Sequence, residues 1–274
     1  MNSLPVHPEA LAALVDNPHR ATWSLGNYSH LGTRLQPVGE TLCEAIDVHA
    51  GERVLDVAAG NGNASLAAAR CGADVTAADF VAELLADARR RAEADGLSLR
   101  TELADAHALP FATASFDVVL STFGVMFAAD QPRAARELLR VCRPGGRIGL
   151  ANWTPQGFVG DLFRAIRRHL PAPAGTRSPL LWGDERSLRE LLGEHATVRT
   201  RHRFFTFRFR SAQHLLEEFR TWYGPTVKAF AELPPEASRE LAGEIVALCG
   251  ARNSADDGTL TVASEYLEVV AVRR

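Results

Sequence analysis

Two acids and two glycines early in the chain are spaced as in a nucleotide-binding βαβ unit. A short apolar strand ending near Asp56 leads into a turn that contains Gly60 and Gly62, and an Ala-rich helix follows. A second strand, 74–78, stops at Asp79. Glycines in such a turn let a ligand approach the backbone, and an acid at the next strand end accepts hydrogen bonds from ribose hydroxyls. The pattern predicts a cofactor that carries a nucleoside.

These residues alone do not decide which cofactor binds. Ser65 stands where a dinucleotide motif has its third glycine, and the Gly-x-Gly pair by itself is common in βα turns. Asp79 has two readings, as a ribose acceptor or as a helix N-cap. NAD and S-adenosylmethionine (SAM) both present ribose hydroxyls. An NAD-dependent oxidoreductase is disfavoured because the chain has no Tyr-x-x-x-Lys pair, its only lysine being Lys228.

The motifs that follow narrow the choice. Asp105-Ala106 ends the third expected strand and has two readings, as a contact to the adenine edge or as a turn acid. Leu-Pro-Phe at 109–111, Ser-Phe-Asp-Val-Val at 115–119 and Leu-Leu-Arg-Val-Cys-Arg-Pro-Gly-Gly-Arg at 138–147 come next. Together with the glycine turn, this set resembles the class I SAM-dependent methyltransferases. It is most similar to the small-molecule group that includes ubiquinone/menaquinone-type C-methyltransferases. The resemblance is strong over residues 34–155.

The resemblance implies a role for each motif residue toward SAM. Gly60, Asn61 and Gly62 would lie against the methionine portion, and Asp56 would order the turn. Asp79 would accept both ribose hydroxyls, and Phe80 would lie beside the adenine. Asp105 and Ala106 would hold the adenine edge, and Ser121 would offer its backbone to the ammonium group. Ala59 and Asn61 depart from the usual residues of the motif without adding blocking bulk.

Aromatic residues before and after the glycine turn are candidates for the methyl-acceptor site. Trp23 and Tyr28 either cover the cofactor and the acceptor as a lid or pack between an N-terminal helix and the sheet. Phe123, Met126 and Phe127 follow the fourth expected strand at the ligand edge, where they either line an apolar acceptor site or pack beneath a cap.

A general base is needed only for an acceptor that must lose a proton. His30 is our candidate because of its place in the lid segment, whereas His107, in the expected adenine loop, is predicted to lie at the surface. His195, His202 and His214 are further histidines with a structural or solvated reading. Because SAM is already activated, the main task of the protein is to align acceptor, methyl group and sulfur in a dry cavity.

Short apolar runs alternate with helical patterns, which predicts an α/β fold with helices on both faces of a mostly parallel sheet. The resemblance implies a Rossmann-like, seven-stranded sheet whose last strand is antiparallel. We expect residues 1–50 to form an N-terminal helical lid and 51–155 the SAM-binding core. Residues 156–274 would continue the same domain with a helical substrate cap and the final antiparallel strands. Strands are expected at 53–58, 74–78, 98–103, 116–121, 146–152, 198–210 and 261–272, and helices at 35–46, 62–71, 81–95, 130–142, 158–169, 185–193, 211–222 and 235–250.

The segment 198–210 alternates arginine and phenylalanine, and the parity of its arginines changes midway. This change predicts a bulge, a bend or a change of neighbouring strand. The arginines are read as the charged side of an edge strand, with an acidic substrate or RNA as the alternative.

Composition excludes several classes of protein. A net charge of −3 gives no reason to expect a nucleic-acid or membrane partner. The four scattered cysteines show no metal-site spacing, so we expect no metal, and they suit a reducing, cytoplasmic location. The N-terminus lacks the features of a signal peptide.

We therefore expect a SAM-dependent methyltransferase that acts on a small aromatic or apolar metabolite, by O- or C-methylation. A SAM-binding protein without methyl transfer is the alternative. The sequence leaves a homodimer open.

Overall fold

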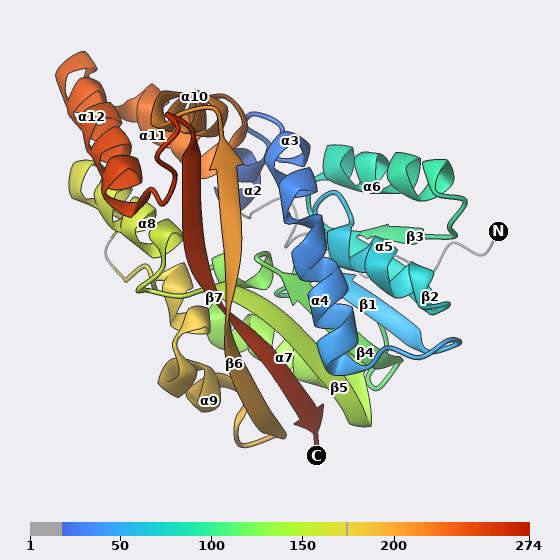
Figure 1. The fold of residues 1–274 in the computed structure, drawn as a ribbon. Helices are drawn as coiled ribbons and strands as arrows, with labels where there is room; N and C mark the ends of the chain where they lie inside the picture. The colour runs from blue at the N-terminus through green and yellow to red at the C-terminus, as the bar shows by residue number, and fades with distance from the viewer. Residues whose placement is uncertain (1–17, 174) are drawn as a thin grey trace.

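Seven strands form one sheet in the computed structural model, which describes residues 18–173 and 175–274. They are β1 (Arg53–Val57), β2 (Asp74–Asp79), β3 (Arg100–Leu103), β4 (Phe116–Thr122), β5 (Cys142–Trp153), β6 (Ala196–Phe209) and β7 (Leu260–Arg273). Their order across the sheet is β3-β2-β1-β4-β5-β7-β6 (Figure 1). The pairs from β3 to β5 are parallel, and β7 runs antiparallel to both of its neighbours. The predicted sheet, with its antiparallel last strand, is confirmed.

The helices for which the sequence predicts bounds begin and end close to those positions, whereas α2 and α3 of the expected lid had no predicted bounds. They are α2 (Pro18–Trp23), α3 (Ser29–Gly32), α4 (Gln36–Ile46), α5 (Asn63–Arg70), α6 (Ala82–Ala94), α7 (Gln131–Val141), α8 (Phe158–His169), α9 (Glu185–Leu192), α10 (Ala212–Trp222), α11 (Gly224–Glu232) and α12 (Pro235–Arg252), with 3-10 turns η1 (Thr33–Leu35), η2 (Val125–Phe127) and η3 (Pro179–Gly183). The sequence analysis missed α11, which begins at a Gly-Pro pair; proline is tolerated there because the first helical turn needs no N–H donor. No helix in the described ranges is both long and apolar enough to cross a lipid bilayer.

The central strands are buried on both faces, as expected for parallel strands between helical layers. Val54, Leu55, Val118 and Val119 are fully buried, and the apolar stripe of α4 packs on the same side as the Ala-rich α5. Figure 1 shows α4, α5 and α6 on one face and α7 and α9 on the other. The helical layers hold the strands in place, so that their carboxyl ends meet at one edge.

Two segments that are distant in sequence cover this edge. Helices α2 and α3 lie beside α11 and α10 above the carboxyl ends of the strands (Figure 1). The contact is close, since a Cβ atom on Gly224 would lie 2.3 Å from the carbonyl oxygen of Thr22. The expected lid at 1–50 is thus described only from residue 18, and residues 1–17 lie outside the described residues.

The prediction of a bulge or a change of neighbour in segment 198–210 is wrong. Strand β6 pairs with β7 in one continuous register, from Ala196 opposite Arg273 to Phe209 opposite Leu260. The covering helices change instead. Helix α9 packs near the start of β6, and Phe219 of α10 packs against Phe209 near its end. Ala196 is buried at the start of the strand and Phe207 and Phe209 at its end, so the buried parity changes along a strand of continuous register. As expected, β6 is an edge strand.

Candidate functional site

The glycine turn is joined to the end of β2 through one carboxylate. Asp79 Oδ2 accepts a hydrogen bond of 2.8 Å from the Gly60 N–H, and Oδ1 accepts one of 2.8 Å from the Val81 N–H. Gly60 adopts a φ of +55°, a conformation that favours glycine. Burial raises the pKa of Asp79 to about 6 against these backbone hydrogen bonds. Each carboxylate oxygen keeps a second lone pair that a ligand hydroxyl can use.

Asp56, at the end of β1, is hydrogen-bonded to α5, the helix that follows the same turn. Its Oδ2 accepts hydrogen bonds from the backbone N–H of Ser65 at 2.9 Å and from the Ser65 hydroxyl at 2.6 Å. Its Oδ1 has no hydrogen-bond partner among the described residues. Burial raises the pKa of Asp56 to about 7. Ser65, at the third-glycine position, therefore uses its side chain to donate a hydrogen bond to the buried Asp56 and not to contact a cofactor.

The loop after β3 is held by a hydrogen-bonded chain. Asp105 Oδ1 accepts from the backbone N–H of His107 at 2.8 Å and lies 2.6 Å from His107 Nδ1. His107 Nε2 accepts from the Asp130 N–H at 3.0 Å, so the proton of a neutral ring resides on Nδ1. The prediction that His107 lies at the surface is wrong, because its side chain is only 12% exposed. It ties the loop to the start of α7.

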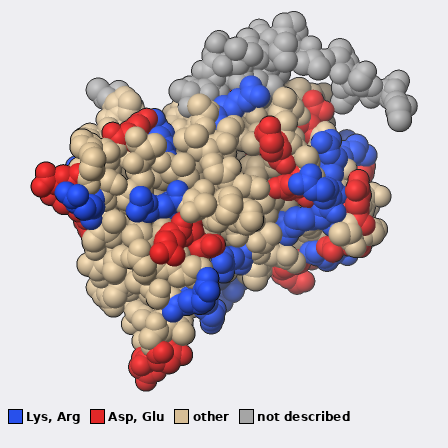
Figure 2. All heavy atoms as spheres, turned by 90° about the horizontal axis from the view of Figure 1, so that it is seen from above, with Lys and Arg blue, Asp and Glu red and all other residues tan. Residues whose placement is uncertain are grey.

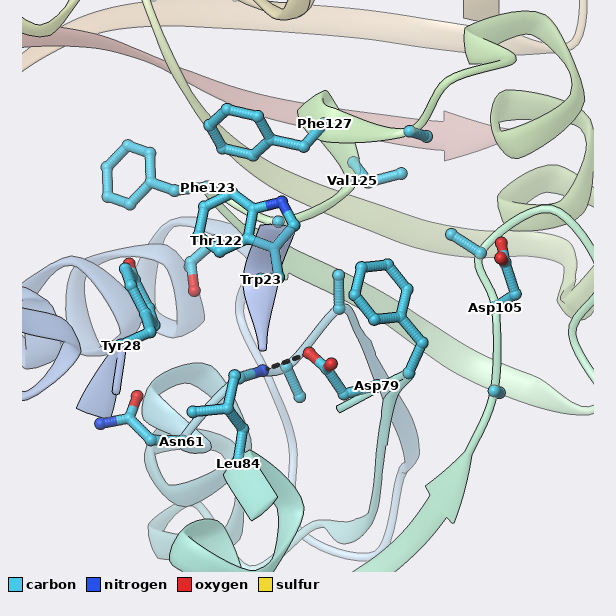
Figure 3. Close-up of a pocket in the computed structure, with 18 of the residues that line it drawn as sticks. Trp23, Tyr28, Asn61, Asp79, Leu84, Asp105, Thr122, Phe123, Val125 and Phe127 are labelled. Atoms are coloured by element: carbon cyan, nitrogen blue, oxygen red, sulfur yellow. Dashed lines mark hydrogen bonds between the residues drawn. The ribbon is translucent and has the colours of Figure 1, made fainter. Parts of the chain in front are cut away.

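These elements surround a pocket at the carboxyl edge of the sheet, which we call the cofactor pocket (Figure 3). Its empty space, including the open mouth, is about 830 Å³, within the range of small-molecule sites. Asp79 and Asp105 lie on one side, and Trp23, Phe123 and Phe127 lie on the other. The pocket is lined by Trp23, Tyr28, Leu35, Ala58, Ala59, Gly60, Asn61, Asn63, Asp79, Phe80, Leu84, Ala104, Asp105, Ala106, His107, Thr122, Phe123, Gly124, Val125, Phe127 and Ala128.

A second cavity, of about 400 Å³, adjoins the cofactor pocket beneath the cap, and we call it the aromatic annex. Its lining contains no charged side chain among the described residues. It consists of Trp23, Tyr28, Leu31, Leu35, Phe123, Phe127, Trp153, Val159, Phe207, Phe219 and Tyr223. The ring of Trp23 packs against three other rings of this lining. Its centroid lies 4.8 Å from that of Phe127, 5.6 Å from that of Tyr223 and 5.7 Å from that of Tyr28. The residues that line it come from the lid, the sheet and the cap.

Most of the predicted site residues converge on these cavities. The pocket brings together ten of them: Trp23, Tyr28, Gly60, Asn61, Asp79, Phe80, Asp105, Ala106, Phe123 and Phe127. Trp23 and Tyr28 line both cavities and pack on one another, and their role as a lid over the cofactor and the acceptor stays a prediction.

Five predicted residues do not line either cavity. Gly62 and Met126 are buried beside the site, as is Asp56. The Ser121 hydroxyl donates to the Val57 carbonyl at 2.7 Å and accepts from the Val125 N–H at 2.9 Å, so its side chain joins two strand ends. His30 is exposed, and its ring stacks on Trp222 at 4.0 Å. The structure thus gives our candidate base no access to either cavity.

Sequence reasoning missed several lining residues. Thr122 and Val125 flank residues that it named, and Leu84 lies in the first turn of the helix after Asp79, so their positions were open to prediction. Tyr223, Phe207 and Phe219 carry no local signal of a site, because only the docking of the cap brings them to the annex.

The backbone at the floor of the site is strained. Phe123 has a φ of +54°, which is unusual for a bulky side chain, and its ring stacks on Trp153 at 3.8 Å with an interplanar angle of 5°. Such conformations persist where the surrounding structure enforces them, often at functional sites. Phe123 lines both cavities and forms part of the wall between them.

The donor and acceptor set fits an adenosyl sulfonium. Asp79 can accept from a sugar diol, and a Cβ placed on Gly60 would meet only the ring of Tyr28, at 3.7 Å, so a ligand can approach this backbone. The buried Asn61 Nδ2 has no hydrogen-bond partner among the described residues, which leaves a donor in the pocket lining. Phe80, Leu84 and Ala106 supply apolar surface for a base.

Comparisons with known proteins agree with this geometry. Residues 55–150 match the model of a methyltransferase domain family. The chain is 44% identical over 237 residues to an uncharacterized protein of Mycobacterium tuberculosis, covering 84% of this chain and 86% of that one. It is 43% identical over 131 residues to a demethylmenaquinone methyltransferase of Thermus thermophilus, covering 46% of this chain and 60% of that protein.

Solved structures share the fold at low sequence identity. The YcgJ protein of Bacillus subtilis superposes with a TM-score of 0.60 at 17% identity, covering 87% of this chain and 99% of that one. A phosphoethanolamine N-methyltransferase of Haemonchus contortus, solved with S-adenosylhomocysteine, gives 0.54 at 18% identity, covering 86% of this chain and 52% of that one. The glycine turn, the acid at the end of β2, the sheet topology and these relatives agree with one another. The chain therefore belongs to the class I SAM-dependent methyltransferases, enzymes whose cofactor is S-adenosyl-L-methionine.

Proposed function

We propose that this methyltransferase transfers the methyl group of SAM to a carbon or oxygen atom of a small, uncharged, aromatic or otherwise apolar metabolite. The observation that carries the proposal is the aromatic annex, which adjoins the cofactor pocket and has no charged lining residue in the described ranges. Figure 2 shows the molecule from above, where uncharged residues cover much of the face and acidic and basic side chains lie among them and around the edge. A demethylmenaquinone methyltransferase among the relatives supports a quinol-type ring as acceptor.

The proposed cofactor contacts follow the lining of the cofactor pocket. Asp79 accepts the ribose hydroxyls, Phe80 lies beside adenine, and Asp105 and Ala106 hold the adenine edge. Gly60 and Asn61 face the methionine portion. Gly62 and Asp56 shape the turn, and Ser121 fixes the end of β4, from which the backbone meets the ammonium group. Trp23, Tyr28, Phe123 and Phe127 face the acceptor, with Met126 packed behind them.

When bound, SAM supplies a methyl group already activated by its sulfonium. The residues of the chain then have to align the acceptor with that methyl group and exclude water, a contribution worth up to several kcal/mol. The rings of Trp23, Phe123 and Phe127 form an apolar enclosure suited to both tasks. Aromatic faces also favour a cationic donor. The annex has no carboxylate or imidazole in its described lining, so the proton that a quinol or naphthol loses on methylation would pass to solvent and not to a side chain of the annex.

We further propose that residues 1–50 act as the lid, 51–155 as the cofactor core and 156–274 as its continuation with the acceptor cap. The meeting of α2 and α3 with α10 and α11 supports this division. A cytoplasmic location is proposed from the four cysteines, none of which forms a disulfide.

Calorimetry with S-adenosylhomocysteine tests the cofactor half of this proposal. Asp79→Ala should weaken binding about ten-fold or more, because it removes a charged acceptor of two hydrogen bonds. Asp74→Ala, at the opposite end of β2 and paired with Arg100 at 2.6 Å, is the matched control and should leave affinity unchanged. Equal affinities for wild type and Asp79→Ala would contradict the proposed ribose contact.

A labelled-methyl assay tests the acceptor half. Purified protein and labelled SAM are offered quinols and naphthols in one set, and amines and carboxylates of equal ring size in the other. Label should enter the uncharged ring compounds. Transfer confined to amines, carboxylates or macromolecules would overturn the proposed acceptor class.

A further inference from the structure

The place of methyl transfer can be located where the two cavities meet. Five residues line both the cofactor pocket and the aromatic annex: Trp23, Tyr28, Leu35, Phe123 and Phe127. A methyl group that passes from a cofactor in one cavity to an acceptor in the other must pass between these side chains. This step rests on the function proposed above, because it takes the annex as the acceptor site.

Polar atoms are scarce at this junction. Of the five shared side chains, only Tyr28 and Trp23 carry a polar group, a phenol hydroxyl and an indole N–H. Tyr223 adds a second hydroxyl within the annex, with its ring centroid 6.3 Å from that of Tyr28. Figure 3 shows the Tyr28 hydroxyl on the side of its ring that faces Phe123. The polar side-chain groups of the annex lining are therefore the two phenols and the indole N–H groups of Trp23 and Trp153.

Neither phenol is used by the protein itself. In the part of the chain that the structure describes, no hydrogen bond joins the hydroxyl of Tyr28 or of Tyr223 to another protein group. Burial raises the pKa of both hydroxyls above the ordinary value, so both keep their protons and can donate. Each hydroxyl is therefore available to donate a hydrogen bond to an oxygen atom of an acceptor in the annex.

We propose that the hydroxyl of Tyr28, supported by that of Tyr223, holds a carbonyl or hydroxyl oxygen of a flat, uncharged acceptor beside the transferring methyl group. Tyr28 then determines specificity in two ways. It selects ring compounds that carry an oxygen over plain hydrocarbons of the same shape. The apolar surroundings reject carboxylates, since an unpaired charge there would be strongly disfavoured. Tyr28 also sets which face or edge of the ring is presented to the cofactor.

The test measures binding of three probes of equal ring size to protein saturated with S-adenosylhomocysteine. Equilibrium dialysis compares 1-naphthol, naphthalene and 1-naphthoate. Wild-type protein should bind 1-naphthol roughly 3–10-fold more tightly than naphthalene, the preference expected of one or two neutral hydrogen bonds. It should bind 1-naphthoate most weakly. Absence of any binding of 1-naphthol, equal binding of 1-naphthol and naphthalene, or preferred binding of 1-naphthoate would overturn the proposal.

Variants that remove only the hydroxyl assign the preference. Tyr28→Phe should bring the affinities for 1-naphthol and naphthalene within two-fold of each other, and Tyr223→Phe should reduce the difference by a smaller factor. Tyr266→Phe is the matched control, because Tyr266 is buried, packs against Phe123 at 5.6 Å and lines neither cavity. A Tyr28→Phe variant that keeps the full preference contradicts the inference.

The affinity for S-adenosylhomocysteine separates this inference from the proposed function. The control Tyr266→Phe, at a residue that lines neither cavity, should bind S-adenosylhomocysteine within two-fold of wild type. If wild type itself fails to bind S-adenosylhomocysteine, the proposed function is wrong. If it binds normally and shows no preference for 1-naphthol, only the role of Tyr28 is wrong.

Discussion

Ala58, which follows β1, and Gly124, which follows β4, are in such close contact that a Cβ atom on Gly124 would lie 2.4 Å from the Ala58 carbonyl oxygen and 2.6 Å from the Ala58 Cβ. The backbone is strained after both strands, since Ala58 has a φ of +52° and Phe123 has a φ of +54°. All three residues line the cofactor pocket. The two central strands therefore end in mutual contact at the floor of the site, and this contact depends on the absence of a side chain at position 124.

Gly124→Ala should accordingly destabilise the protein. The added methyl group overlaps backbone atoms that cannot turn away, so we expect a loss of about 1–3 kcal/mol in the free energy of unfolding and weaker binding of S-adenosylhomocysteine. Urea denaturation measures the first and calorimetry the second. Gly243→Ala is the control, because a Cβ there meets nothing within 4 Å and alanine favours the helix α12. Similar stability changes in the two variants would contradict the tight contact.

Cofactor affinity should rise with pH through the titration of Asp79. The pKa of Asp79 is raised to about 6 by burial, and the ionised carboxylate is the better acceptor for ribose hydroxyls. Affinity for S-adenosylhomocysteine should therefore be roughly ten-fold higher at pH 7.5 than at pH 5. Asp79→Asn should bind weakly with little pH dependence over this range. A wild-type affinity that is flat between these pH values would refute the proposed role of the carboxylate.

Asp56 should make the apo protein less stable as the pH rises. Burial raises its pKa to about 7 in the folded state, whereas in the unfolded chain it is about 4. The folded state thus holds this proton more tightly, so the stabilisation is complete below about pH 4 and is lost as the pH rises through about 7. Asp56→Asn keeps an acceptor for Ser65 without this titration.

The measurement compares urea denaturation of wild type and Asp56→Asn at pH 5 and pH 7.5. Wild type should lose more free energy of unfolding between these values than the variant does, by on the order of 1 kcal/mol or more. Parallel pH profiles of the two proteins would show that Asp56 does not titrate in this range.

Arg91 should support the glycine turn from helix α6. Its guanidinium donates to the Asn61 carbonyl at 2.6 Å, to Asn63 Oδ1 at 2.8 Å and to Gln36 Oε1 at 3.2 Å. Arg91→Ala should weaken binding of S-adenosylhomocysteine about 3–10-fold by loosening the turn, which calorimetry can measure. Arg91→Lys should restore little, because an ammonium cannot reproduce the planar fork of donors.

Arg90→Ala serves as the control for Arg91→Ala. Arg90 lies on the same helix with a side chain 69% exposed, and it pairs with Asp87. Its loss should leave the affinity unchanged, since exposed ion pairs contribute little. An equal effect of the two substitutions would mean that the general charge of α6, and not the bonds of Arg91, affects the cofactor.

The sequence predicts the cofactor pocket well because its signals are local. Gly60 and Asp79 lie at the ends of adjacent parallel strands, and alternation of strands and helices is enough to bring such ends to one edge. Side-chain direction is harder to predict. Ser121 and Thr122 are neighbours in β4, yet only Thr122 lines the pocket, because successive side chains of a strand point to opposite faces.

The acceptor side could be predicted only in part. Trp23 and Tyr28 were identifiable as aromatic residues in the lid, but Tyr223 meets them only because α10 and α11 dock on that lid. His30 shows the same limit, since its stacking on Trp222 follows from docking and not from local pattern. In β6, the change of parity was correctly recognised in the sequence, but it occurs without a break in register, and different helices, α9 and α10, pack against the strand.

The position of β7 between β5 and β6 has a consequence for how the enzyme is assembled. When β6 emerges during synthesis, the neighbour it needs has not yet been made, because β7 comes about fifty residues later in the chain. Phe207 and the helices that follow it cannot take their final places until that strand inserts. The part of the active site that binds the methyl donor can thus fold early during synthesis, whereas the part that binds the second substrate forms only after β7 has joined the sheet.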